Sequence, residues 1–67
     1  MRNEKLRTVR VLKRLPQDAL AALTGLDRSV ISRIENGWLE PSAQQRKTLA
    51  AALGVLEGSI FSEPKKR

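Results

Sequence analysis

Arginine and serine side chains recur within one short polar stretch near the middle of the chain, at positions 28, 29, 32 and 33. In a helix, residues three or four positions apart share a face, so these side chains would form one hydrogen-bonding surface. A guanidinium group donates to two acceptors at once, and a hydroxyl group both donates and accepts. The pattern fits recognition of a polar, anionic partner, although an ordinary solvated helix face would show the same spacing. Its members are Arg28, Ser29, Ser32 and Arg33.

The other residue types argue against catalysis. The chain has neither His nor Cys, which removes the commonest general base, the commonest metal ligand and any disulfide framework. Its seven carboxylates are scattered, Ser29 and Ser32 have no nearby candidate base, and there is no Gly-rich phosphate loop. We therefore expect no enzyme activity, no metal site and no cofactor.

The charge balance points to a polyanionic partner. Thirteen Lys and Arg residues stand against seven Asp and Glu, for a formal net charge of +6, which favours nucleic acid or an acidic membrane surface. The basic first helix could lie on a membrane, but its apolar side is needed for the small core. RNA is disfavoured because aromatic residues for stacking are nearly absent. Double-stranded DNA is the favoured partner.

The length of 67 residues allows one domain, residues 1–67, with an ordered core over about 4–62 and a basic tail at 63–67. No apolar run approaches the roughly 20 residues needed to cross a bilayer, and no signal-peptide pattern is seen at residue 1. Together with the lack of Cys, these features suit a cytoplasmic protein, and we expect no membrane partner.

Proline, glycine and capping residues divide the chain into short helical blocks. We expect helices over 4–14, 17–23, 28–36 and from about 42 to 53, with a weak fifth block at 57–62 in which Ile60 and Phe61 plug the core. Asp27 is placed to cap the third helix, and Ser42 with Gln45 has capping-box spacing. No strand pattern of useful length is present. The expected fold is all-α, a compact bundle of four to five short helices.

The segment from Gln17 to Gly37 predicts a helix-turn-helix. It holds a short helix, a turn built on Gly25 and a second helix with Ile31 and Ile34 on its apolar side. In this motif two helices cross at a steep angle and the first braces the second. Ala21 is small enough to let the two helices approach each other.

From about Leu6 to Phe61 the sequence resembles the Cro and lambda-repressor-like helix-turn-helix family, also called the xenobiotic-response-element family. The run ISRIENG is the most specific part of the resemblance. The residues that carry it are Gln17, Leu20-Ala21, Gly25, Arg28-Ser29, Ile31 to Gly37, Pro41-Ser42, Leu49-Ala50 and Ala52 to Gly54.

The resemblance implies a transcriptional regulator, such as a repressor, that inserts its third helix (about 28–36) into the major groove, commonly as a homodimer on a pseudo-palindromic operator. By position, it assigns base contacts to Arg28, Ser29 and Arg33, with Ser32 next. Guanidinium groups suit this role because they can bond guanine O6 and N7 together. It also assigns phosphate contacts to Gln17, Asn36 and Arg10, and an orienting ion pair to Arg10 and Glu35.

Some residues depart from the family pattern and leave alternatives open. Asp27 stands where Ser or Thr is usual; we expect it to cap the helix rather than accept from cytosine. Val11 and Leu12 are apolar where many members are charged, so they either refill the core or form a partner surface. Trp38 either anchors a partner or covers the core edge. An alternative function follows: an antitoxin or adaptor whose main partner is another protein.

Overall fold

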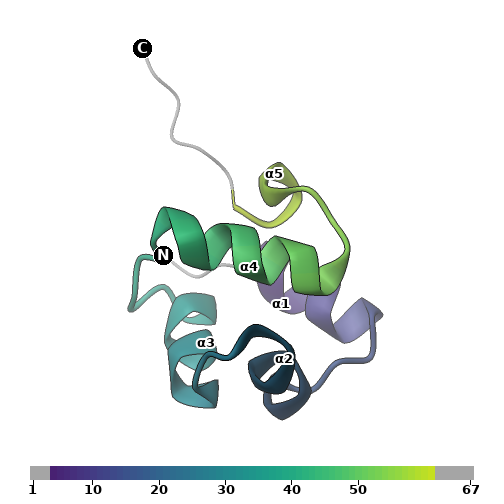
Figure 1. Ribbon diagram of the computed structural model, residues 1–67, viewed down its shortest axis with the longest axis horizontal. Coiled ribbons are helices and arrows are strands. Elements are labelled where there is room, and N and C mark those ends of the chain that lie inside the picture. Colours follow the sequence, from purple (N-terminus) through teal and green to yellow (C-terminus); the bar gives the residue numbers. More distant parts are fainter. Residues whose placement is uncertain (1–3, 62–67) are drawn as a thin grey trace.

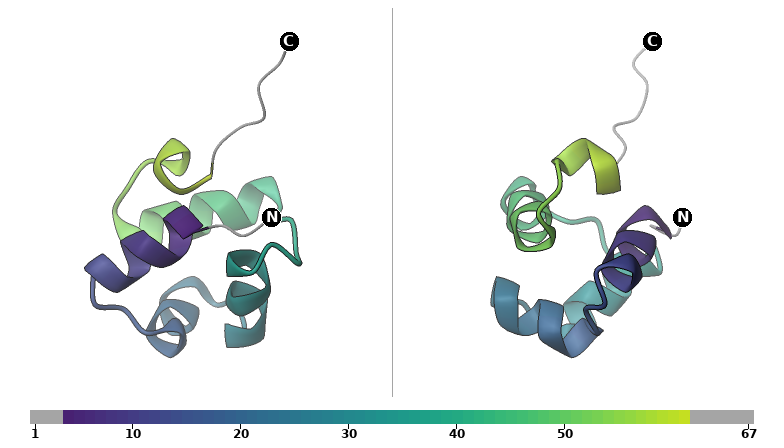
Figure 2. Two further views of the ribbon diagram at one scale, coloured as in Figure 1. Left: turned by 180° about the vertical axis from the view of Figure 1, so that it is seen from behind. Right: turned by 90° about the vertical axis from the view of Figure 1, so that its right-hand side faces the viewer.

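The computed structural model describes residues 4–61, and this part of the chain is entirely helical apart from its turns. The helices are α1 (Glu4–Leu12), α2 (Gln17–Thr24), α3 (Arg28–Glu35), α4 (Ala43–Leu53) and α5 (Glu57–Ile60). Helices α2 and α3 lie side by side at one end of the molecule, α5 lies at the other end, and α1 and α4 lie between them (Figures 1 and 2). The predicted all-α helix bundle is confirmed.

Every helix contributes to one apolar core. The core consists of Leu6, Leu20, Ile31, Ile34, Leu49, Ala50, Leu53, Ile60 and Phe61. Fully burying a Leu, Ile or Phe side chain contributes about 1.5–3 kcal/mol relative to leaving it exposed, so the core residues fix how the helices pack. Ile60 and Phe61 are therefore core residues, as the sequence predicted, although α5 is only one turn long.

Helix α1 ends earlier than predicted, at Leu12 rather than Arg14. Arg14 takes a left-handed backbone conformation, with φ 59°, and the Leu15 amide reaches back to the Arg10 carbonyl at 3.0 Å. Pro16 disfavours a helical conformation at the residue before it and has no amide hydrogen of its own. The chain therefore leaves the helix before the proline and turns into α2.

The turn between α2 and α3 is built as the sequence predicted. Gly25 has φ 77°, a conformation that glycine adopts without strain, and its amide donates to the Ala21 carbonyl at 2.8 Å. The Thr24 hydroxyl donates to the Leu20 carbonyl at 2.9 Å and accepts from the Leu26 amide at 3.2 Å. These bonds fix the direction in which α3 leaves α2.

The two predicted helix caps have different outcomes. At α4, the Gln45 amide donates to Ser42 Oγ at 3.1 Å and the Ser42 amide donates to Gln45 Oε1 at 2.9 Å, which confirms the capping box. At α3, Asp27 occupies the N-cap position, but its side chain makes no capping bond. That prediction was wrong: the Asp27 carbonyl begins the helix by accepting from the Val30 and Ile31 amides, and its carboxylate lies at the surface.

Five large apolar side chains of the described residues remain exposed, and three of them, Val11, Leu12 and Trp38, were given alternative roles from the sequence. Val11 and Leu12 are 56% and 75% exposed, so they do not refill the core, and Trp38 is 80% exposed, so it does not cover the core edge.

The predicted basic tail at 63–67 lies outside the described residues. None of the helices within residues 4–61 has the length and apolar character that crossing a bilayer demands.

Candidate nucleic-acid interface

Helix α3 has one buried side and one exposed side. Ile31 and Ile34 are 0% and 2% exposed, whereas Arg28, Ser29 and Arg33 are exposed and Ser32 is half-buried. The isoleucines anchor the helix to the core, and the exposed side is left for a partner. This division of the helix follows the pattern predicted from its sequence.

Arg28 has a neighbour that sequence reasoning missed. Its Nη1 atom lies 3.6 Å from Oδ1 of Asp18, and both side chains are largely exposed, at 64% and 77%. Asp18 is in the first turn of α2, where an acidic residue is expected simply because it suits the helix dipole. Only the packing of α2 against α3 brings its carboxylate next to the exposed side of α3.

Ser32 and Asn36 are linked along α3. The Asn36 side-chain amide donates to the Ser32 carbonyl at 2.8 Å and approaches the Ser32 hydroxyl at 3.4 Å. An amide group carries two hydrogens and a hydroxyl one. The two contacts therefore account for both hydrogens of the Asn36 amide, whereas the Ser32 hydroxyl keeps its O–H for a bond outside the protein.

A polar cluster lies beneath this end of α3 and consists of the buried Arg10 and Glu35 and the half-buried Gln17. Arg10 donates through Nε to Glu35 Oε2 at 2.6 Å and through Nη2 to Oε1 at 3.2 Å, which confirms the predicted ion pair. Gln17 Nε2 also donates to Oε1, at 3.1 Å. The remaining terminal nitrogen of Arg10 donates to the Leu15 carbonyl at 3.0 Å. The cluster ties α1, α2 and α3 together.

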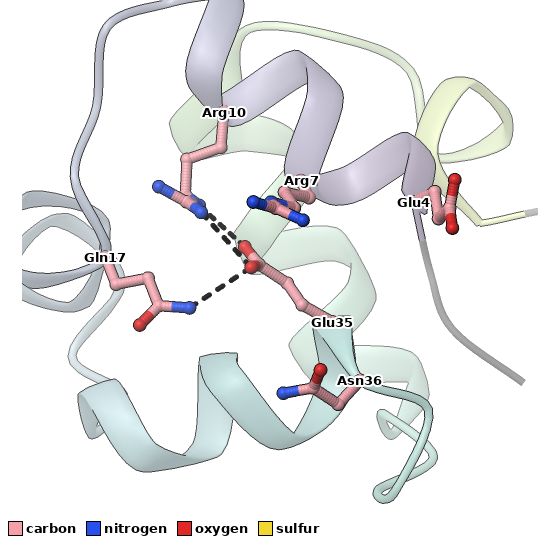
Figure 3. A pocket seen from close by; sticks show the side chains of 6 residues that line it. All are labelled: Glu4, Arg7, Arg10, Gln17, Glu35 and Asn36. Atoms are coloured by element: carbon pink, nitrogen blue, oxygen red, sulfur yellow. Dashed lines mark hydrogen bonds and ion pairs between the residues drawn. The ribbon is translucent and has the colours of Figure 1, made fainter.

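This cluster forms the base of an open pocket of about 310 Å³. Figure 3 shows Arg7 and Arg10 projecting from α1 toward the space bordered by Gln17, Glu35 and Asn36. Arg7 is exposed, whereas the Arg10 side chain is only 11% exposed. Sequence reasoning counted Arg7 among the basic residues of the first helix but gave it no individual contact, although its spacing of three from Arg10 places both on one helix face. Glu4 completes the lining.

The chemistry of this surface is that of hydrogen-bond donors. Arginine, amide and hydroxyl groups gather around one exposed helix and one polar pocket, and such groups are suited to phosphate oxygens and base edges. Within residues 4–61 no cluster of acidic side chains has the arrangement that would hold a metal ion.

Comparison with known proteins identifies the class. The model of the helix-turn-helix family matches residues 6–58, which include α2, α3, the turn between them and most of the core. The chain therefore belongs to the helix-turn-helix family of the Cro and lambda-repressor type, a class of DNA-binding transcription regulators that are not enzymes.

Among solved structures, the chain is similar to the restriction-modification controller protein C.AhdI from Aeromonas hydrophila. The two share 37% sequence identity, the match covers 88% of this chain and 89% of that one, and the TM-score is 0.84. The five-helix, lambda-repressor-like fold is thereby confirmed. A comparison with curated proteins gave no match.

Proposed function

We propose that this domain regulates transcription by binding a specific duplex DNA sequence, with α3 inserted in the major groove. The observation that carries the proposal is the two-sided character of α3. Arg28, Ser29 and Arg33 are exposed, while two isoleucines of the same helix are buried. A helix anchored in this way can enter the groove without disturbing the fold.

Base selection is assigned to the exposed side of α3. Arg28 and Arg33 can each donate two hydrogen bonds to O6 and N7 of a guanine, an interaction worth about 1–3 kcal/mol of discrimination. Ser29 is exposed beside Arg28 and can donate to or accept from either base of a pair. Ser32 is assigned a weaker share because it is half-buried and linked to Asn36.

Phosphate contacts are assigned to the rim of the polar pocket. Gln17 and Asn36 lie at the start of α2 and just after α3, and Arg7 adds a cation between them. Such contacts fix the register of a protein on DNA without reading its sequence. The guanidinium of Arg10 already has three bonds to acceptors within the protein, so we assign it the orienting role and transfer the phosphate role to Arg7.

We further propose that the domain acts as a homodimer on an operator with two related half-sites. Two recognition helices of a dimer then lie about 34–36 Å apart, one turn of DNA. The likeness to a restriction-modification controller protein supports a role in which occupancy of the operator controls transcription of nearby genes.

The test is selection of bound sites from random duplex DNA by the full chain, at a fixed salt concentration. We expect one enriched motif with two inverted halves whose centres are 10 to 10.5 base pairs apart, or a multiple of that spacing. A matched selection uses the Arg28→Ala/Arg33→Ala double variant, which should enrich a less defined motif. A wild-type pool with no enriched motif would overturn the proposal, and a single unpaired half would overturn the dimer alone.

The protein-binding alternative is supported by a different surface. Val11 and Leu12 are exposed on α1 and line a shallow groove with Glu4, Arg7 and Thr8. Aromatic and aliphatic side chains of this kind are common at interfaces between proteins, and Trp38 is also exposed. Phe61 is buried in the core and takes no part in this surface. Copurification of a stoichiometric protein partner, without any enriched DNA motif, would favour this alternative.

A further inference from the structure

Asp18 places a negative charge beside the first arginine of the recognition helix. Its carboxylate Oδ1 lies 3.6 Å from Arg28 Nη1. Asp18 is the second residue of α2 and Arg28 is the first residue of α3, so the pair spans the two helices of the helix-turn-helix. A carboxylate at this position is unfavourable for general attraction to DNA, because it faces the same polyanion as the arginine.

We infer that Asp18 is a specificity-determining residue, which holds the guanidinium of Arg28 in position for a guanine and penalises binding to other sequences. The inference rests on the proposed function, since it requires that Arg28 contact a base.

The first part of the argument concerns the position of the guanidinium. An arginine side chain is long and loses rotamer freedom when it binds. A carboxylate held on the side of Nη1 leaves Nη2 and Nε free, and these two nitrogens can meet the two acceptors of guanine. In the protein without DNA, the Asp18–Arg28 pair is exposed and its attraction is weak. Once the DNA excludes water from the groove, the attraction between the two charges increases.

The second part concerns sequences without a guanine at that site. There Arg28 gains no two-point bond, while the Asp18 carboxylate still repels the phosphates. The penalty applies to every sequence, so it lowers the affinity for unrelated DNA without changing the ratio of two Kd values, and the ratio itself depends on how Asp18 positions Arg28. Only the correct base restores the affinity, through its bond to Arg28, so an attractive contact and a repulsive one act together.

A simpler role for Asp18 makes a different prediction. An acidic residue in the first turn of α2 interacts favourably with the helix dipole. If that were its whole role, its loss would lower thermal stability and leave the base preference of the domain unchanged.

The experiment measures the Kd of the full chain, at one salt concentration, for the selected operator and for duplexes with single base-pair changes. The base pair read by Arg28 is the one at which Arg28→Ala abolishes the preference. The discrimination of wild type and of each variant is defined as the Kd for the duplex changed at this base pair divided by the Kd for the operator. We expect Asp18→Asn to lower the discrimination by about three- to tenfold, a fraction of what a complete guanine contact supplies, and to tighten binding to unrelated DNA. Asp18→Glu should retain most of the discrimination.

The matched control is Asp27→Asn. Asp27 is also exposed, lies next to α3 and makes no side-chain capping bond, so the same charge is removed at the same end of the helix. It should tighten binding to unrelated DNA and leave discrimination at the Arg28 base pair unchanged. Equal discrimination in wild type and Asp18→Asn, with a loss in Arg28→Ala, would overturn the inference alone. If Arg28→Ala altered the base preference at no base pair, both this inference and the base contact of Arg28 in the proposed function would be overturned.

Discussion

The guanidinium of Arg10 and the carboxylate of Glu35 meet at two points inside the protein, Nε to Oε2 at 2.6 Å and Nη2 to Oε1 at 3.2 Å. Their side chains are only 11% and 6% exposed. A buried pair of this kind is costly to desolvate, and its net contribution to stability is small. Removing one partner is different, because the other charge then remains buried without compensation.

Replacing Arg10 with Leu should therefore lower the free energy of unfolding by about 3–5 kcal/mol. A domain of this size has little stability beyond that amount, so we expect a largely unfolded chain at room temperature. Urea denaturation followed by circular dichroism measures the loss. The double variant Arg10→Leu/Glu35→Leu should recover most of the stability, because it leaves no unpaired charge.

The control for this change is Arg7→Gln, which removes an exposed arginine from the same helix and should alter stability by no more than about 0.5 kcal/mol. A single Arg10→Leu variant as stable as this control would contradict the buried-pair argument.

Ile31 anchors α3 to the core and is completely buried. The Ile31→Ala substitution should cost about 2–5 kcal/mol, the range for a buried aliphatic side chain. Leu23→Ala is a suitable comparison, because Leu23 is 60% exposed and its loss should be tolerated. Thermal melts of both variants check the prediction, and equal melting temperatures would mean that α3 is rotated relative to the core.

The sequence was sufficient for the features that depend on local pattern. Helix boundaries at Gly25 and Gly54 follow from the left-handed conformation that glycine accepts, and the Ser42 capping box follows from residue spacing. The inward side of α3 was evident from the separation of its two isoleucines. In each case a few neighbouring residues determine the outcome.

Features that depend on packing between helices could not be predicted from local pattern. The contact of Asp18 with Arg28 and the place of Arg7 beside Gln17 and Asn36 arise only when α1, α2 and α3 assemble. The Arg10–Glu35 pair was anticipated through family resemblance and not from spacing. Asp27 shows the opposite error: a residue of the right type stands at the N-cap, yet the helix begins without its side chain.

Arg28 and Arg33 should each contribute to the choice of base. We expect Arg28→Ala and Arg33→Ala to weaken binding to the selected operator more than binding to unrelated DNA, with a loss of about 1–3 kcal/mol of discrimination at one base pair each. Titrations against a panel of single-substitution duplexes locate those base pairs. Lys13→Ala removes an exposed cation outside α3 and should leave the pattern of preference intact. Unchanged selectivity in both arginine variants would refute their assignment.

Arg7 and Gln17 should both contact phosphates, yet their loss should affect salt dependence differently. A cation that binds a phosphate releases counterions, so Arg7→Gln should reduce the slope of log K against log salt by about 1. Gln17→Ala removes only a neutral donor, so it should weaken binding while leaving that slope unchanged. Both variants should weaken operator and unrelated DNA alike, because phosphate contacts do not read sequence. Binding measured from low to moderate salt on both duplexes separates the two effects. A sequence-selective loss in either variant would contradict its phosphate role, and an unchanged slope for Arg7→Gln would place that arginine outside the DNA contact.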